Sequence, residues 1–239
     1  MTNFKIQIIS DNVCPWCYVG YRRLTRAITA HKTTHPTDTF TLHWQAFYLN
    51  PTAPGYPGIN KQEMYRAKFG AARMAAMFSR LSAAGDGDGI AFRFGGNTGS
   101  TRDSHRLVWY AGQEEARMTA AADETAQPLS TATTTTAVGG LQTRVVENLF
   151  RAYFEQERNI TDREVLADAA AGAGLDCEAV RKWLESDAGG PEVDLEAESA
   201  SRRLVTGVPY FLVQDKYSVE GADEPEGFLE VFERVKRDE

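Results

Sequence analysis

The sequence predicts an α/β fold in which two sheet-forming segments, one at each end of the chain, are separated by a long helical segment. Apolar and polar residues alternate near the start of the chain and again after residue 205, which is typical of strands with one buried face. Between about residues 61 and 204 the apolar residues recur every three or four positions, which is typical of helices. We therefore expect one α/β part, residues 1–58 and 205–239, interrupted by an inserted helical part, residues 59–204.

The composition fits a globular chain and argues against several classes of protein. Of the 239 residues, 42% are hydrophobic and 25% are charged, and the net charge of -7 argues against nucleic acid or an anionic membrane as the main partner. No apolar run approaches the roughly 18–20 residues that a membrane-spanning helix needs. The first residues lack the basic and apolar regions of a secretory signal, so we expect a cytoplasmic protein.

The first part of the chain predicts a strand, a helix and a second strand. Residues 4–9 alternate between apolar and polar, and residues 40–46 alternate again. Between them, the apolar spacing over residues 17–28 predicts a helix. Cys14 and Cys17 are therefore expected at the turn that leads from the first strand into the helix.

The inserted part contains helix signals and one stretch without them. A helix is expected from Thr101 through Arg117, and Pro191 suits the first turn of the last helix before the sheet resumes. Residues 161–164, Thr-Asp-Arg-Glu, match a capping box with Thr161 as its first residue. Residues 121–140 are biased to Thr and Ala, and we expect a flexible insertion there.

The end of the chain predicts a hairpin followed by a helix. Residues 209–213 and 216–219 alternate, and the short Gln214-Asp215 link suits a tight turn between antiparallel strands. The apolar spacing after Pro225 predicts the closing helix.

The Cys14-Pro15-Trp16-Cys17 segment is the strongest chemical signal in the sequence. Three residues apart on a helix is about one turn, which brings two sulfurs within reach of a disulfide. Cys14 would lie at the helix N-terminus, where unpaired N–H groups and the helix dipole stabilise a thiolate. We therefore expect Cys14 to be a nucleophile that forms a mixed disulfide and Cys17 to be the residue that resolves it.

Other interpretations of these residues remain open. Trp16 either offers a substrate an apolar platform or covers the turn as a packing residue. A zinc site would need further ligands from Cys177 or the histidines, of which only His31 and His35 are close in sequence, and we expect no metal. A structural disulfide is not expected in a reducing compartment. Cys177 stands alone and is interpreted as a small buried apolar residue.

Pro209 follows Val208 at the start of an expected buried strand. An ordinary trans proline at a strand start is the simpler interpretation, since proline is accepted there. Its position after the helical insertion, opposite the cysteine pair, favours a cis bond instead. The Val208 backbone would then be open to strand-like pairing with a peptide or with glutathione.

Five segments together resemble the FrnE-like DsbA-family thiol-disulfide oxidoreductases. They are residues 11–20 (Asp-Asn-Val-Cys-Pro-Trp-Cys-Tyr-Val-Gly), 67–70, 101–107, 149–154 and 207–211. The resemblance implies a thioredoxin fold interrupted by a large inserted α-helical domain, dithiol–disulfide chemistry, and a cis proline at Pro209. The related 2-hydroxychromene-2-carboxylate isomerases share this architecture, use glutathione, and typically have Ser in place of the first Cys.

The same resemblance places Arg102 and His105 where they face the active site. We interpret them as ligands for an anionic substrate or for glutathione; helix capping and surface ion pairing are the alternative.

Three functions follow from these expectations. The first is a DsbA-like oxidoreductase acting on a protein or small-molecule disulfide, with Cys14, Cys17 and Pro209 as catalytic residues and Trp16, Val208, Arg102 and His105 in contact with substrate. It needs no tightly bound cofactor, and glutathione is a candidate co-substrate. The second is a glutathione-dependent isomerase or transferase acting on an aromatic or polyketide-derived molecule. The third is a non-enzymatic binding module. A homodimer is also considered.

Overall fold

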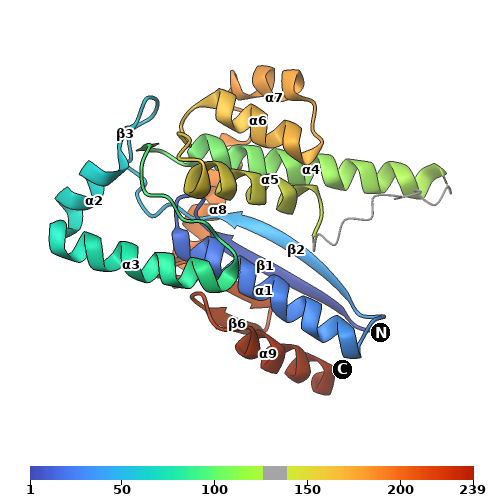
Figure 1. Cartoon of the computed structure of the whole chain (residues 1–239). Helices are drawn as coiled ribbons and strands as arrows, with labels where there is room; N and C mark the ends of the chain where they lie inside the picture. The colour runs from blue at the N-terminus through green and yellow to red at the C-terminus, as the bar shows by residue number, and fades with distance from the viewer. Residues whose placement is uncertain (126–138) are drawn as a thin grey trace.

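The computed structural model describes residues 1–125 and 139–239, and its centre is a four-stranded sheet (Figure 1). The sheet has the strand order β2-β1-β5-β6. β1 pairs in parallel with β2, and β5 pairs in antiparallel fashion with β1 and β6. The strands are β1 Asn3–Ser10, β2 Thr39–Ala46, β5 Tyr210–Val213 and β6 Tyr217–Glu220. Both sheet-forming ends of the sequence thus meet in one sheet, as predicted.

Period-two alternation in β1 decides which helices cover each face of the sheet. Phe4, Ile6 and Ile8 are fully buried in the main core, and the Phe4 ring contacts Phe232 of the closing helix at 5.0 Å. Ile9 points the other way and packs in a second cluster with Ala200 and Val205. The dithiol helix α1 (Pro15–Thr34) and the closing helix α9 (Pro225–Asp238) pack against each other beside the sheet.

The hairpin between β5 and β6 turns at Gln214 and Asp215, as the sequence predicts. Both residues have positive φ, 54° and 53°, and the Lys216 N–H donates to the Val213 carbonyl at 3.1 Å. Two successive residues with positive φ are the mark of a type I′ turn, whose twist matches that of paired strands.

The inserted part is helical, with a small sheet that the sequence did not predict. Two short strands, β3 and β4, pair in antiparallel fashion. The elements are β3 Ile59–Asn60, α2 Lys61–Phe69, α3 Ala71–Asp88, β4 Asn97–Thr98, α4 Arg102–Thr125, α5 Leu141–Phe150, the π-helix η1 Arg151–Glu155, α6 Arg163–Ala173, α7 Cys177–Leu184 and α8 Gly190–Arg202. Pro191 lies in the first turn of α8, as expected.

Two boundaries in this part differ from the prediction. Helix α4 continues to Thr125, so residues 121–125 of the expected flexible insertion are helical, and residues 126–138 lie outside the described residues. Helix α6 is capped by Asp162, whose carboxylate accepts the Glu164 N–H at 3.0 Å. The capping box predicted at Thr161 was wrong, because the Glu164 N–H donates to Asp162 and the Thr161 hydroxyl donates to Asn159 Oδ1 instead.

A continuous buried core joins the two parts of the chain. One cluster contains Cys14 and Cys17, residues of the sheet, and apolar residues of α4, α5, α6 and α7 such as Leu107 and Val145. In Figure 1, α4, α5, α6 and α7 are stacked on one side of the sheet region, and their successive pairs are in contact. The division into two domains stays a prediction. None of the described helices is long and apolar enough to span a membrane.

Two buried charges stabilise contacts between elements, and the first of them joins the inserted part to the dithiol helix. The Asp88 carboxylate at the end of α3 accepts from Arg23 Nε and an Arg26 guanidinium nitrogen of α1, both at 2.8 Å. Lys61 is 2% exposed, and its Nζ donates to the Tyr153 carbonyl at 3.1 Å and lies 3.7 Å from the centroid of the Tyr153 ring. Burial lowers the pKa of Lys61 to about 8, against the opposing charge of Glu157.

Candidate active site at the dithiol helix

Cys14 is the N-cap residue of α1, and Pro15 follows it in the first turn. Its backbone is extended, with φ -88° and ψ 112°, and its N–H donates to the Asp11 carbonyl at 2.9 Å. No side-chain hydrogen bond caps the helix, and Pro15 brings no N–H to its first turn, so no polar side chain competes with the Cys14 sulfur there. Cys14 therefore lies where the helix dipole favours a thiolate.

Cys17 lies one turn further along and is more deeply buried. It is 1% exposed and Cys14 is 5% exposed, and the Cys17 N–H donates to the Cys14 carbonyl at 3.1 Å. Burial, a side-chain hydrogen bond with Cys14 and the negative charge of Cys14 raise the pKa of the Cys17 thiol well above its ordinary value. The neighbouring Ser10 hydroxyl and Asp11 backbone act in the opposite direction without reversing the shift. The two thiols thus lie close together, and the more deeply buried Cys17 thiol is the one whose pKa is raised.

The Val208–Pro209 step faces Cys14. The Cys14 thiol donates to the Val208 carbonyl at 3.5 Å, and the peptide bond between Val208 and Pro209 is cis. Gly20 of α1 makes the close approach of Pro209 sterically feasible. A Cβ on Gly20 would lie 2.9 Å from Pro209 Cγ, closer than real contacts allow. Sequence reasoning missed Gly20, although a glycine six residues into a helix is a signal of close packing.

A buried polar group lies behind the turn that holds Cys14. The Asp11 carboxylate accepts the Leu49 N–H at 2.8 Å, and His105 Nε2 lies 3.5 Å from Asp11 Oδ1 without forming a hydrogen bond. The side chain of Asn12 donates to Ser104 at 2.9 Å. Helix α4 is therefore bound to the active-site turn through the Asn12–Ser104 hydrogen bond, and the buried His105 ring lies beside Asp11.

Trp16 and Tyr65 flank the dithiol from different helices. Trp16 is half-buried, and the Arg80 guanidinium of α3 lies 5.2 Å from its ring. Burial and the negative charge of Cys14 raise the pKa of Tyr65, on α2, to about 12. The sequence identified Tyr65 only as part of a helical pattern, because its approach to Cys14 depends on where the fold places α2.

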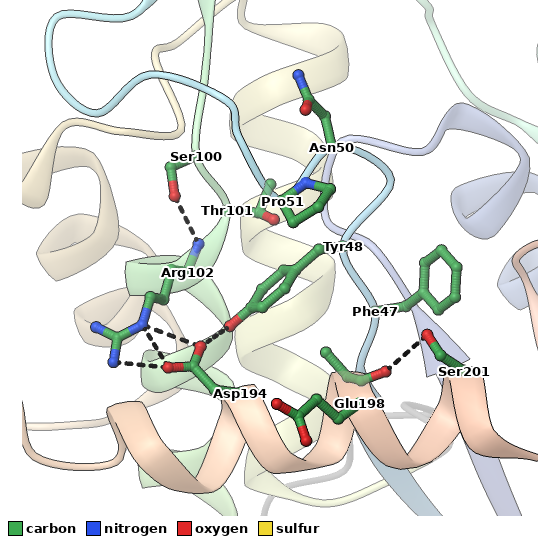
Figure 2. A pocket seen from close by; sticks show the side chains of 11 residues that line it. Phe47, Tyr48, Asn50, Pro51, Ser100, Thr101, Arg102, Asp194, Glu198 and Ser201 are labelled. Atoms are coloured by element: carbon green, nitrogen blue, oxygen red, sulfur yellow. Dashed lines mark hydrogen bonds and ion pairs between the residues drawn. The ribbon is translucent and has the colours of Figure 1, made fainter.

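Arg102 lies in a pocket beside this site rather than at the sulfurs. Its guanidinium is bound to Asp187 at 2.5 Å. It also pairs with Asp194 at 3.0 Å, and the Tyr48 hydroxyl donates to the same Asp194 carboxylate at 2.9 Å (Figure 2). The pocket has a volume of about 480 Å³ between α8 and the loop after β2. Asp187 and Asp194 therefore already form ion pairs with the Arg102 guanidinium.

The pocket and the Val208 step share one apolar support. Phe47, which forms one wall of the pocket, and Val208 both pack against the cluster that contains Ile9 and Ala200. Tyr48 connects the pocket to the active-site turn, because its ring lies 5.6 Å from that of His105. The residues predicted to bind substrate therefore form two groups, with Trp16 and Val208 at the dithiol and Arg102 and His105 along α4.

Nothing among the described residues assembles a metal site around the cysteines. Within residues 1–125 and 139–239, no group of three or more His, Cys, Asp or Glu side chains at metal-binding distance includes Cys14. His31 and His35 lie at the opposite end of α1, a 20-residue helix about 30 Å long. Cys177 is the first residue of α7 and is half-buried, whereas the sequence was interpreted as giving a buried residue there.

Comparison with known families agrees with this geometry. The sequence pattern of the DSBA-like thioredoxin domain matches residues 5–127 and 121–233. The chain belongs to the DSBA-like thioredoxin family. Its fold is accordingly the thioredoxin-like α/β fold with helical content that the sequence predicted. No curated protein matches the chain.

Several solved structures resemble this DSBA-like chain over nearly its whole length. A probable DsbA oxidoreductase from Streptomyces coelicolor is 28% identical with a TM-score of 0.77, covering 99% of this chain and 91% of its own. A 2-hydroxychromene-2-carboxylate isomerase is 16% identical with a TM-score of 0.63, covering 98% and 97%. The cytosolic disulfide reductase DsbM from Pseudomonas aeruginosa, with glutathione, is 17% identical with a TM-score of 0.51, covering 98% and 99%. The last two show a shared fold.

Proposed function

We propose that this DSBA-like chain is a thiol–disulfide oxidoreductase that uses Cys14 and Cys17 through a mixed disulfide. The observation that carries the proposal is the position of Cys14 at the N-terminus of α1, with its sulfur 3.5 Å from the Val208 carbonyl and Cys17 one turn behind it. A nucleophile, a resolving thiol and a backbone group that can position the substrate lie together there, as disulfide exchange requires.

The difference between the two thiols gives the reaction its order. The Cys14 thiolate attacks one sulfur of a substrate disulfide, the S–S bond breaks, and the other half leaves as a thiolate. Cys17 stays protonated until then, because burial and the Cys14 charge raise its pKa. Once Cys14 is in the mixed disulfide its charge is gone. Cys17 then loses its proton to the released thiolate and attacks the Cys14 sulfur, so that the S–S bond between Cys14 and the substrate breaks and the second half of the substrate leaves as a thiolate. The substrate is reduced by two electrons, and the Cys14–Cys17 disulfide forms.

Val208 and Trp16 are proposed to hold the substrate next to the sulfur. A chain bonded to Cys14 meets the Val208 backbone, whose carbonyl accepts from the Cys14 thiol in the reduced protein. The half-buried Trp16 ring offers an apolar surface on the other side. Two electrons reside on the dithiol, so no tightly bound cofactor is needed, and glutathione is the proposed co-substrate. The free Cys177 suits a reducing compartment, and we include a cytoplasmic location.

The test is a pair of single variants made in a Cys177→Ser background. Cys17→Ser should accumulate a mixed disulfide through Cys14 when treated with an aromatic disulfide such as 5,5′-dithiobis(2-nitrobenzoate), seen by intact mass as one added thionitrobenzoate. Cys14→Ser should accumulate none over the same time. Equilibration of the unmodified dithiol with glutathione and its disulfide should give one two-electron midpoint.

The same variants separate the alternatives. A glutathione-dependent isomerase would keep its turnover in Cys17→Ser and lose it in Cys14→Ser. A binding module would show no disulfide turnover in any form. Equal labelling of both single variants, or no midpoint in the glutathione titration, would remove the oxidoreductase proposal.

A further inference from the structure

Two histidines and a glutamate meet at the end of α1 that is far from the dithiol. His31 lies in the last turn of the helix and His35 is its C-cap residue, and their rings stack with centroids 4.5 Å apart. Glu233 of α9 lies across from them. One nitrogen of each histidine and one carboxylate oxygen of Glu233 all lie within 4.8 Å of one another.

The hydrogen-bond partner of His31 decides which of its nitrogens carries a lone pair. His31 Nε2 lies 3.0 Å from Asp38 Oδ2 in the interior. The same carboxylate is paired with Lys236, whose Nζ donates to Oδ2 at 2.6 Å, and its Oδ1 accepts the Thr2 N–H at 2.8 Å. An ionised carboxylate can only accept, so Nε2 carries the proton and Nδ1 is left with a free lone pair.

The same reasoning applies to His35 through a different partner. The Thr34 hydroxyl donates to the His31 carbonyl at 3.1 Å, which uses its one proton. Its oxygen lies 3.0 Å from His35 Nδ1, so that nitrogen is the donor and Nε2 of His35 is left with the lone pair. Each imidazole is thus neutral and oriented, with one nitrogen free to bind.

The surroundings favour a cation at this point. The C-terminus of α1 carries the negative end of the helix dipole. Glu233 is exposed and forms no ion pair with any of the described residues. Lys236, three residues after Glu233 on α9, is already paired with Asp38 at 2.6 Å.

We propose that His31, His35 and Glu233 bind a divalent transition-metal ion of the Zn²⁺ type. Two imidazoles and a carboxylate with an open fourth position are a ligand set that Zn²⁺ accepts. Asp38, bonded to the far nitrogen of His31, is the supporting carboxylate that such sites usually contain. Tetrahedral bonds of about 2.0–2.1 Å require ligand atoms about 3.3 Å apart. Rotation of the half-buried His35 and the exposed Glu233 side chains closes the remaining distance.

The ion would connect the end of the dithiol helix to the closing helix α9. It does not depend on the cysteines, so it is tested in a chain that lacks them. In a Cys14→Ser/Cys17→Ser/Cys177→Ser variant, calorimetric titration with Zn²⁺ alone should show one equivalent bound, and Zn²⁺ should raise the melting temperature. Co²⁺ should give visible absorption bands of a site with nitrogen and oxygen ligands.

Surface variants make the outcome decisive without disturbing the core. His35→Ala and Glu233→Gln should each weaken Zn²⁺ binding by a factor on the order of 100 and abolish the rise in melting temperature. His43→Ala, an exposed histidine on β2, and Glu230→Gln, an exposed carboxylate one turn away on α9, should leave both unchanged. Equal Zn²⁺ affinity in His35→Ala and its parent, or an equal loss in His43→Ala, would overturn the proposal.

Discussion

Replacing Gly20 by alanine tests how tightly the dithiol helix is packed against Pro209. In a helix interior this change ordinarily stabilises by about 1 kcal/mol. Here the new Cβ would lie 2.9 Å from Pro209 Cγ and 3.1 Å from Phe211 Cζ, where carbon contacts prefer about 3.5–4.0 Å. Overpacking of this kind costs about 1–3 kcal/mol. Gly20→Ala should therefore be between neutral and about 2 kcal/mol less stable than the parent.

Gly87→Ala is the matched control, because Gly87 is also helical but its Cβ would meet nothing within 4 Å. The difference in unfolding free energy between the two variants, measured by denaturant titration, isolates the packing cost and should be about 1–3 kcal/mol. Displacing Pro209 also moves Val208, so disulfide exchange at Cys14 should slow by a factor on the order of 10. If Gly20→Ala matched Gly87→Ala in stability and the parent in exchange rate, the reasoning would be refuted.

Three further predictions concern buried charges. The pKa of Asp38 is lower in the folded protein than in the unfolded chain, so its ionised form stabilises the fold above about pH 4, and this stabilisation is lost as the pH falls towards the folded pKa. Asp38→Asn should lower the unfolding free energy by about 2–4 kcal/mol at pH 7. Between pH 5 and 2 its unfolding free energy should fall less steeply than that of the parent. The folded pKa of Lys61, about 8, lies below its value in the unfolded chain, so the unfolding free energy of the parent should rise between about pH 8 and 10. The advantage in unfolding free energy of Lys61→Met over the parent should therefore be greatest below pH 8 and shrink above it. A difference that does not change with pH would contradict this. Asp88→Asn leaves Arg23 without its buried partner and should cost about 3 kcal/mol in denaturant titration, whereas Glu198→Gln, which breaks an exposed pair, should cost less than about 1 kcal/mol.

The sheet and its flanking helices could be predicted because their sequence patterns are local. Alternation over residues 4–9 and 40–46 identified β1 and β2, and the Gln214-Asp215 link identified the hairpin turn. The capping residue of α6 was missed because Thr161 and Asp162 are adjacent and both are residue types that cap helices, and only the fold shows that the Glu164 N–H donates to Asp162. The strands β3 and β4 are two residues long, too short to show any period.

The site was predictable where its residues are close in the chain and less so where the fold brings them together. Cys14 and Cys17 are specified by spacing and by the turn before α1. Arg102 begins α4, as the sequence led us to expect, but its ion pairs with Asp187 and Asp194 depend on where α8 packs. These pairs could not be predicted because the two carboxylates are distant from Arg102 in the sequence. Gly20 matters because of an atom on Pro209, which lies 189 residues further along the chain. Such residues become visible only with coordinates.

The continuous core has a consequence for how the sulfur chemistry is tuned. Unfolding the reduced chain and unfolding the oxidised chain are two legs of a thermodynamic cycle, and the other legs are the midpoint potentials of the folded and unfolded dithiol. Val145 of α5 belongs to the same cluster as both cysteines. A substitution there that alters the two unfolding free energies unequally must shift the folded potential, by about 30 mV for each 1.4 kcal/mol of difference. Helix packing remote from the sulfurs therefore helps to set the midpoint potential of the dithiol.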